Sequence, residues 1–207
     1  MHDFIVDLDG YFCEKYANYD KLCVLPGYKM PLMQRSEVDD FGRTRTYTLP
    51  ADTMCLAKQE KKEELLAALK AKMTDTTFSF SFLPLNIFQR IGNRFSKFAF
   101  YKNLRIALNK YGMTDAEVLE NLTISEEVWK GIVKGKFLPT KNLLFSLALT
   151  AQLSYDDLTS LMALCEYEFD FSIVKDVVIA YLLQTSVYNR GMIDRALAEY
   201  KVTNLFI

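Results

Sequence analysis

The sequence has very little histidine and no cluster of cysteines. Its 207 residues include one histidine, His2, and four widely separated cysteines: Cys13, Cys23, Cys55 and Cys165. A hydrolytic triad needs an imidazole beside its nucleophile, and structural zinc needs thiolates and imidazoles in a cluster. The composition therefore argues against both kinds of site, and we assign neither metal ligands nor a cofactor.

Long apolar runs and glycine-rich phosphate loops are also missing. The longest uncharged runs, Thr76–Gln89 and Asn142–Tyr155, are too short to span a bilayer, and the first contains a proline. The N-terminus carries an acid where a signal peptide carries lysines. Scattered thiols suit a reducing compartment. These features predict a cytoplasmic protein without a membrane segment.

Basic and acidic residues nearly balance over the whole chain, but one stretch contains only basic ones. The formal net charge is −1, which gives no global attraction to nucleic acid or anionic lipid. Between residues 84 and 114, however, there are basic residues and no acids. This stretch fits the solvated face of a helix, and it also fits an acid- or phosphate-binding ridge. The residues of that ridge would be Arg90, Arg94, Lys97, Lys102 and Arg105.

Residues 1–83 have the pattern of a small α+β domain with an antiparallel sheet and one main helix. Phe4–Leu8 is apolar enough to start a strand. Tyr28–Val38 and Arg43–Leu49 flank the turn sequence Asp39–Gly42, and threonines alternate along the second segment with the period of a strand. The pattern predicts a hairpin.

A helix and a further strand complete this half. Lys58–Met73 has leucines at helical spacing, glutamates early and lysines late, which suits the helix dipole. In Thr77–Leu83 the rings of Phe78, Phe80 and Phe82 fall on one face of a strand. Those rings fit a core against the helix, and they also fit a stacking platform for bases.

The rest of the chain is predicted to form a connection at residues 84–97 and a helical domain at residues 98–207. Capping residues and glycines mark where its helices start and stop: Gly112, Thr114 with Glu117, Ser125, Gly135 and Ser154. Leu143–Leu153 is apolar nearly all round, as expected of a central helix. Trp129 is expected to anchor the third helix in the core, with an exposed contact as the alternative.

Part of this half resembles a known family. The residues that carry the likeness are Thr114-Asp-Ala-Glu-Val-Leu, Leu122-Thr-Ile-Ser125, Ile132-Val-Lys-Gly-Lys136, Pro139 and Leu143–Leu149. They resemble the lambda-repressor-like (Cro/C1, Xre) helix-turn-helix over about residues 98–167. The stretch is also similar to a helical module that follows macrodomains in uncharacterised bacterial proteins. The first resemblance implies a third helix that enters the DNA major groove.

Carboxylates occupy positions at which that family contacts DNA. The family has a glutamine early in the second helix and polar or basic residues at the start of the third, whereas this chain has Asp115, Glu126 and Glu127. Carboxylates repel phosphates, although a glutamate can accept a hydrogen bond from cytosine. The cations left for DNA contact are Lys130, Lys134, Lys136 and Lys141.

Residues 172–202 add two helices after this core. Ser172 is expected to cap the first, and Gly191 precedes the second. In repressors of this fold such additions often form a homodimer. They would equally serve to cover the bundle.

One string near the N-terminus looks catalytic. Phe4–Gly10 contains Asp7 and Asp9 and resembles the first motif of haloacid-dehalogenase-like phosphatases, in which the first aspartate, here Asp7, attacks phosphorus. Tyr11 stands where that family usually has Thr or Val, and the parallel sheet that the fold requires is not predicted. Both aspartates are more simply interpreted as helix-cap or turn residues.

The sequence therefore favours a non-enzymatic regulatory or adaptor protein that acts through protein–protein contacts on a helix-turn-helix scaffold. A sequence-specific DNA-binding regulator is the alternative, and a phosphatase using Asp7 is a distant one. The partner is accordingly either an unidentified protein or duplex DNA.

Overall fold

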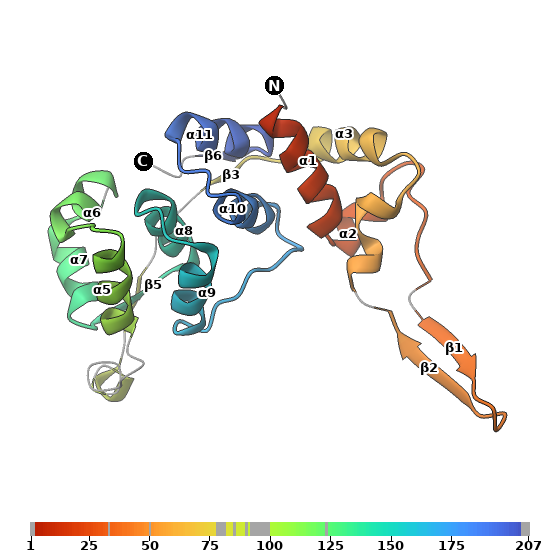
Figure 1. Cartoon of the computed structure of the whole chain (residues 1–207), viewed down its shortest axis with the longest axis horizontal. Helices are drawn as coiled ribbons and strands as arrows, with labels where there is room; N and C mark the ends of the chain where they lie inside the picture. The colour runs from red at the N-terminus through yellow and green to blue at the C-terminus, as the bar shows by residue number, and fades with distance from the viewer. Residues whose placement is uncertain are drawn as a thin grey trace. The chain divides into compact units, whose positions relative to one another are not determined.

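The computed structural model describes residues 3–32, 34–49, 51–77, 82–84, 86–89, 91, 100–122 and 124–203 (Figure 1). The fold class is α+β, as predicted, with a two-stranded antiparallel sheet near the N-terminus. The chain forms two compact units. The first combines Met1–Thr74 with Asp170–Val178, and the second combines Asp75–Phe169 with Ile179–Ile207. Asp170–Val178, which we expected in the helical domain, therefore belongs by its contacts to the N-terminal unit.

The first element of the chain is a helix, so the strand predicted at Phe4–Leu8 is wrong. Helix α1 (Phe4–Lys15) begins after Asp3, whose carboxylate accepts a hydrogen bond from Ile5 N at 3.2 Å. Buried residues recur every four positions along one face of α1 and at its C-cap: Leu8, Phe12 and Tyr16. This spacing, together with the cap, outweighs the strand preference of the β-branched residues that follow Asp3.

The helix predicted at Lys58–Met73 is confirmed as α3 (Lys62–Lys72), with a later start. The residues before it form short 3₁₀ helices instead, η1 (Ala51–Met54) and η2 (Leu56–Lys58). The leucines of α3 form its buried face: Leu65, Leu66 and Leu69. A short helix, α2 (Tyr19–Leu22), follows α1.

The predicted hairpin is confirmed as β1 (Gln34–Val38) paired antiparallel with β2 (Thr44–Thr48). Asp39 organises the turn, because its Oδ1 accepts hydrogen bonds from Phe41 N at 3.0 Å and Arg43 N at 2.9 Å. Gly42 has a φ of +72°, a conformation that glycine adopts at little cost.

Helices follow one another through the second unit: α5 (Phe100–Lys110), α6 (Asp115–Asn121), α7 (Glu126–Val133), α8 (Lys141–Thr150) and α9 (Tyr155–Ala163). The predicted caps at Thr114, Ser125 and Ser154 are confirmed. Helix α8 is buried along Leu143–Leu149, which makes it the centre of this unit. Trp129 is 3% exposed, so its prediction as a core anchor is confirmed.

Short strands tie distant segments of this unit together. β3 (Thr76–Thr77) pairs in parallel with β6 (Val202–Thr203), and β4 (Phe82–Pro84) pairs antiparallel with β5 (Phe137–Pro139). Of the strand predicted at residues 77–83 only the two ends are described, as parts of β3 and β4, and Phe78 and Phe80 lie outside the described residues.

The last two helices start differently from the prediction. Ser172 is not the residue before α10 (Val174–Gln184), which begins directly after Ile173, and its hydroxyl donates a hydrogen bond of 2.7 Å to Asp170 Oδ1. Gly191 lies inside α11 (Arg190–Glu199) instead of before it. The cap of α11 is Asn189, whose side chain accepts a hydrogen bond from Met192 N.

Candidate functional site

Two short helices, α6 and α7, form the surface that the sequence analysis singled out. A capping box fixes the start of α6: Thr114 N donates to Glu117 Oε2 at 2.7 Å, and Glu117 N donates to Thr114 Oγ1 at 3.3 Å. Ser125 Oγ accepts a hydrogen bond from Val128 N at the start of α7. The buried apolar residues are Val118 of α6, Leu122 directly after it, and Trp129 and Ile132 of α7. The other face of α7 therefore presents polar side chains to solvent.

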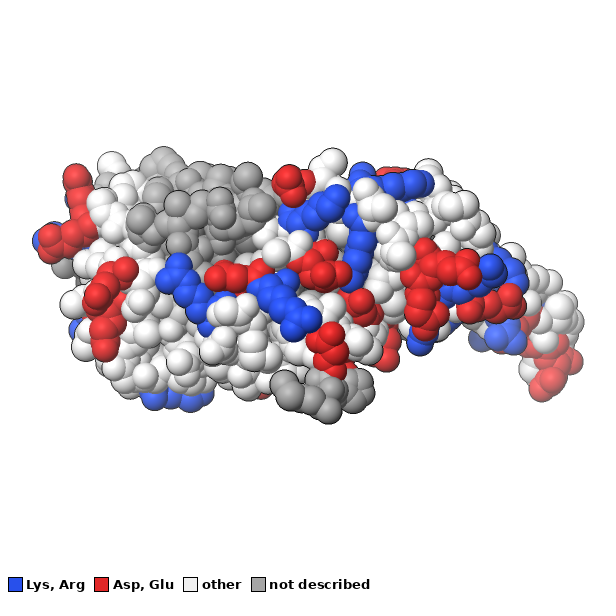
Figure 2. Space-filling model, turned by 90° about the horizontal axis from the view of Figure 1, so that it is seen from above, with Lys and Arg blue, Asp and Glu red and all other residues white. Residues whose placement is uncertain are grey.

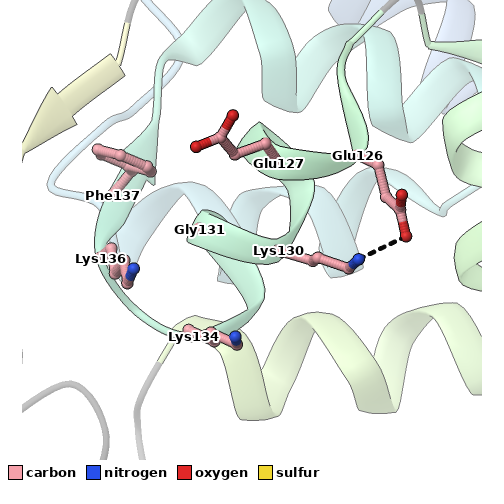
Figure 3. A pocket seen from close by; sticks show the side chains of 7 residues that line it. All are labelled: Glu126, Glu127, Lys130, Gly131, Lys134, Lys136 and Phe137. Carbon is pink, nitrogen blue, oxygen red and sulfur yellow. Dashed lines mark ion pairs between the residues drawn. The ribbon is translucent and has the colours of Figure 1, made fainter.

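An open pocket of about 340 Å³ lies along α7 and the turn that follows it (Figure 3). It is lined by Glu126, Glu127, Lys130, Gly131, Lys134, Lys136 and Phe137. The fold thus brings three of the predicted cations, Lys130, Lys134 and Lys136, to one place. Lys141 is not part of this lining. Its ammonium lies 5.7 Å from the centre of the Phe145 ring at the start of α8.

The pocket carries charges of both signs. Glu126 and Lys130 form an ion pair of 2.6 Å, and the hydrogen bond from Lys130 lowers the pKa of Glu126. Within the described part of the chain, Glu127, Lys134 and Lys136 have no ion-pair partner. The charges left for a ligand are one carboxylate and two ammonium groups, which makes the pocket mixed and not strongly cationic.

Gly131 and Phe137 shape the pocket wall, and neither was predicted from the sequence to belong to a site. A Cβ added at Gly131 would meet Phe137 Cε2 and Cδ2 closer than carbon atoms approach one another. The ring of Phe137 therefore packs on the backbone of α7 because residue 131 has no side chain. A glycine inside an otherwise helical pattern was the available signal, since it often marks a close approach.

The acids at the start of α6 are already engaged within the protein. Asp115 Oδ2 forms an ion pair of 3.2 Å with Arg105 Nη1 on α5. The backbone and hydroxyl of Thr114 both donate to Glu117 and lower the pKa of its carboxyl. Both carboxylates hold helices in place, so neither is available to a partner without breaking a local contact.

The predicted basic ridge is only partly described. Arg90, Arg94 and Lys97 lie outside the described residues. Lys102 and Arg105 lie on α5 and are exposed, and Arg105 is paired with Asp115. The structure therefore brings neither Lys102 nor Arg105 into the α7 pocket.

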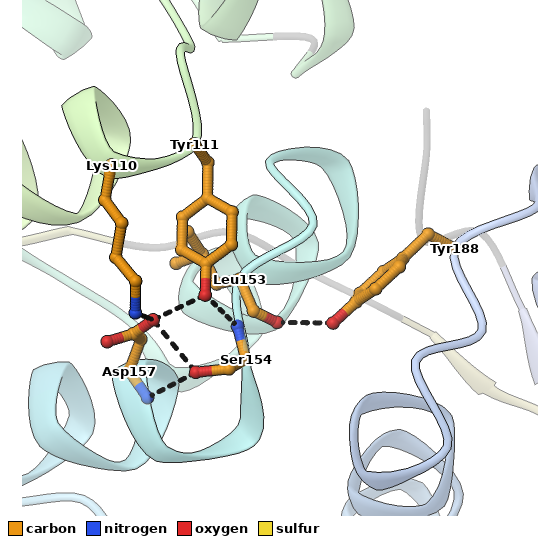
Figure 4. A network of polar contacts seen from close by, with 6 residues as sticks. All are labelled: Lys110, Tyr111, Leu153, Ser154, Asp157 and Tyr188. Carbon is orange, nitrogen blue, oxygen red and sulfur yellow. Dashed lines mark hydrogen bonds and ion pairs between the residues drawn. The ribbon is translucent and has the colours of Figure 1, made fainter.

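A polar network that was not predicted from the sequence joins α5 to α9 (Figure 4). Asp157 Oδ2 accepts hydrogen bonds from Lys110 Nζ at 2.7 Å, Tyr111 Oη at 2.6 Å and Ser154 Oγ at 2.9 Å. Burial would raise the pKa of Asp157, but these hydrogen bonds outweigh it and lower the pKa. Tyr188 Oη donates to the Leu153 carbonyl beside it at 2.8 Å. The network thus links the end of α5 to the first turn of α9.

Basic and acidic side chains are interspersed over the face shown in Figure 2. That distribution matches the balanced composition of 25 basic and 26 acidic residues. A broad cationic field of the kind that steers nucleic acids is not visible among the described residues of this face.

The aspartates of the phosphatase-like string lie on helix α1 and not at the end of a strand. Asp9 forms an ion pair of 2.7 Å with Lys70 of α3, and both side chains are partly buried. Asp9 therefore links α1 to α3. Asp7 therefore lies in a helix, whereas the motif requires the end of a strand.

No family model, curated protein or solved structure matches this chain. Among the described residues, no helix combines the length and the apolar character needed to cross a membrane.

Proposed function

We propose that this protein is a non-enzymatic regulator or adaptor that binds another protein through a lambda-repressor-like helix-turn-helix scaffold. Two features support the scaffold. Helices α6 and α7 are short, separately capped and close together in the sequence. A buried helix, α8, follows them after the short strand β5. This order is the one that the sequence resemblance implies.

The observation that carries the proposal is the charge at the start of α7. Glu126 and Glu127 are both exposed there, where a DNA-reading helix would meet the duplex. Lys130, one turn later, is already neutralised by Glu126. Duplex affinity depends on neutralising phosphates, so this helix tip is poorly suited to DNA. A mixed-charge pocket with an aromatic wall suits a polypeptide partner better.

Sequence-specific DNA binding is the second candidate, and Lys134 and Lys136 favour it. Both line the pocket at the end of α7, and neither has an ion-pair partner among the described residues. They could neutralise phosphates if the duplex approached the end of the helix instead of its start.

Homodimerisation through the C-terminal helices has little support in the burial pattern. Residues Val177 to Leu183 of α10 are buried, which leaves that helix little free face. The outer side of α11 carries Arg190, Asp194 and Arg195, and Met192 is its only large exposed apolar side chain among the described residues. Covering the bundle is the simpler role for both helices.

The proposal is tested by photocrosslinking from position 134 in an extract of the source cells, followed by nuclease treatment of the adducts. A photoreactive residue at 134 should give a protein adduct that survives nuclease treatment and weakens when Glu127 and Lys136 are charge-reversed. The same probe placed at Lys21, in the other unit, is the control and should not give that adduct. Adducts that consist only of nucleic acid and disappear with nuclease would reject the proposal.

A further inference from the structure

The β1–β2 hairpin exposes both of its faces. Every residue of both strands is exposed, including the side chains of Val38 (67%) and Tyr47 (40%), and Phe41 at the turn is 84% exposed. An isolated two-stranded hairpin is only marginally stable in water, because neither face rests on a core. A further strand along one edge would give the ribbon the support that it lacks.

The register identifies which backbone groups are free at the edges. Asp39 N donates to Arg43 O at 3.0 Å, so residues 39 and 43 form a hydrogen-bonded pair next to the turn. Hydrogen-bonded and non-hydrogen-bonded pairs alternate along an antiparallel ladder. The pair Ser36–Thr46 is therefore non-hydrogen-bonded, and the N–H and C=O groups of both residues point outward. The same holds for the residues at positions 34, 38, 44 and 48.

The two edges differ in charge. β1 carries one base and one acid, Arg35 and Glu37, placed symmetrically on either side of Ser36. β2 carries Arg45 and no acid, with Arg43 just before it. Two copies of β1 in antiparallel order are thus complementary in charge, whereas two copies of β2 provide no acid to pair with Arg45.

We propose that β1 pairs antiparallel with β1 of a second copy of this chain, around a two-fold axis at Ser36. The outward N–H and C=O of Ser36 then bond to those of Ser36 in the second copy. Residues 34 and 38 pair with residues 38 and 34 in the same way. The result is a continuous four-stranded sheet with an isologous contact. This inference does not depend on the proposed function.

Charge pairs fix the register of this dimer. Arg35 of each copy stands opposite Glu37 of the other, and these are non-hydrogen-bonded pairs, in which side chains approach most closely. Within one chain Arg35 and Glu37 already lie 3.3 Å apart on the same strand, both more than half exposed. A slip of one residue would move both charges to the opposite face, so the complementary register is singled out.

Matched proline variants test which edge is used. Ser36→Pro removes an outward N–H from β1, and Thr46→Pro removes the equivalent group from β2, while neither residue donates to the β1–β2 ladder. Both lose the same 2.9 Å contact between the two hydroxyls. In sedimentation velocity over a wide concentration range, the wild type should dimerise reversibly. Ser36→Pro should weaken the dimer at least tenfold, and Thr46→Pro should leave it within a factor of three.

Charge reversal gives an independent test. Arg35→Glu places acids opposite acids, and Glu37→Arg places bases opposite bases, so each variant alone should be monomeric. An equimolar mixture of the two should form a heterodimer, because every acid then meets a base. The proposal is overturned if the wild type stays monomeric or if the mixture of charge-reversed variants does not associate. It is also overturned if Ser36→Pro leaves the dimer intact, or if Thr46→Pro weakens the dimer as much as Ser36→Pro does.

Discussion

The hydroxyl of Tyr111 donates a hydrogen bond of 2.6 Å to Asp157 Oδ2, and this contact joins the end of α5 to the first turn of α9. The same hydroxyl accepts a hydrogen bond from Ser154 N at 3.0 Å. Tyr111 therefore satisfies a carboxylate and a backbone donor at once, between segments far apart in sequence.

Tyr111→Phe should destabilise the protein by about 1–3 kcal/mol, because it leaves a partly buried carboxylate and a backbone N–H each without one partner. Tyr188→Phe is the matched control. It removes one hydrogen bond to the Leu153 carbonyl and should cost about 0.5–1.5 kcal/mol. Urea unfolding measures both values. Equal effects would show that the Asp157 network adds nothing beyond an ordinary hydrogen bond.

The same network predicts how stability depends on pH. The pKa of Asp157 is lowered in the folded protein. Its contribution is therefore fully present above the unfolded value of about 3.9 and is lost as the pH falls through the folded value. Between about pH 5 and pH 3 the wild type should lose more unfolding free energy than Asp157→Asn does. Parallel stability curves for the two proteins would contradict this assignment.

Gly131 and Gly10 give a matched pair of helix glycines. A Cβ added at Gly10 would meet open space, so Gly10→Ala should stabilise the protein by about 0.5–1 kcal/mol. Gly131→Ala must displace the Phe137 ring and should be less favourable than Gly10→Ala by about 1–3 kcal/mol. Thermal or urea unfolding of both variants measures the difference, and in a Phe137→Ala background that penalty should disappear. If Gly131→Ala is as favourable as Gly10→Ala in the wild type, the ring does not pack there.

The cysteines should react very unequally with a thiol reagent. Burial raises the pKa of Cys13 to about 11 and that of Cys165 to about 12, and Cys55 is 3% exposed. Cys23 is the partly exposed thiol. At pH 8 one thiol should be labelled rapidly, and Cys23→Ser should abolish that phase. Rapid labelling of Cys13 or Cys165 would contradict the packing of α1 or of the turn that follows α9.

Features set by a few neighbouring residues could be predicted from the sequence. The capping box at Thr114, the cap at Ser125 and the Asp39–Gly42 turn depend on local hydrogen bonds, so their residue types are informative. The prediction for the start of the chain was wrong because β-branched residues suit a strand, whereas the four-residue spacing of buried side chains decided for a helix.

Contacts between distant residues could not be predicted in this way. Nothing in the local sequence pairs Tyr111 with Asp157, since that bond forms only after α5 and α9 have packed. The packing of Phe137 on Gly131 likewise depends on how the chain turns back after α7. In the candidate site, the lysines on α7 and directly after it were predicted and their pocket was not.

The most direct test of the proposed function is a fluorescence polarisation titration against random duplex DNA at about 50 and 200 mM salt. If the carboxylates at the start of α7 exclude DNA, the wild type should bind weakly, and Lys134→Ala with Lys136→Ala should change that little. Glu126→Gln with Glu127→Gln should strengthen binding and steepen its salt dependence. Tight wild-type binding that falls steeply with salt and is lost with the two lysines would contradict the account.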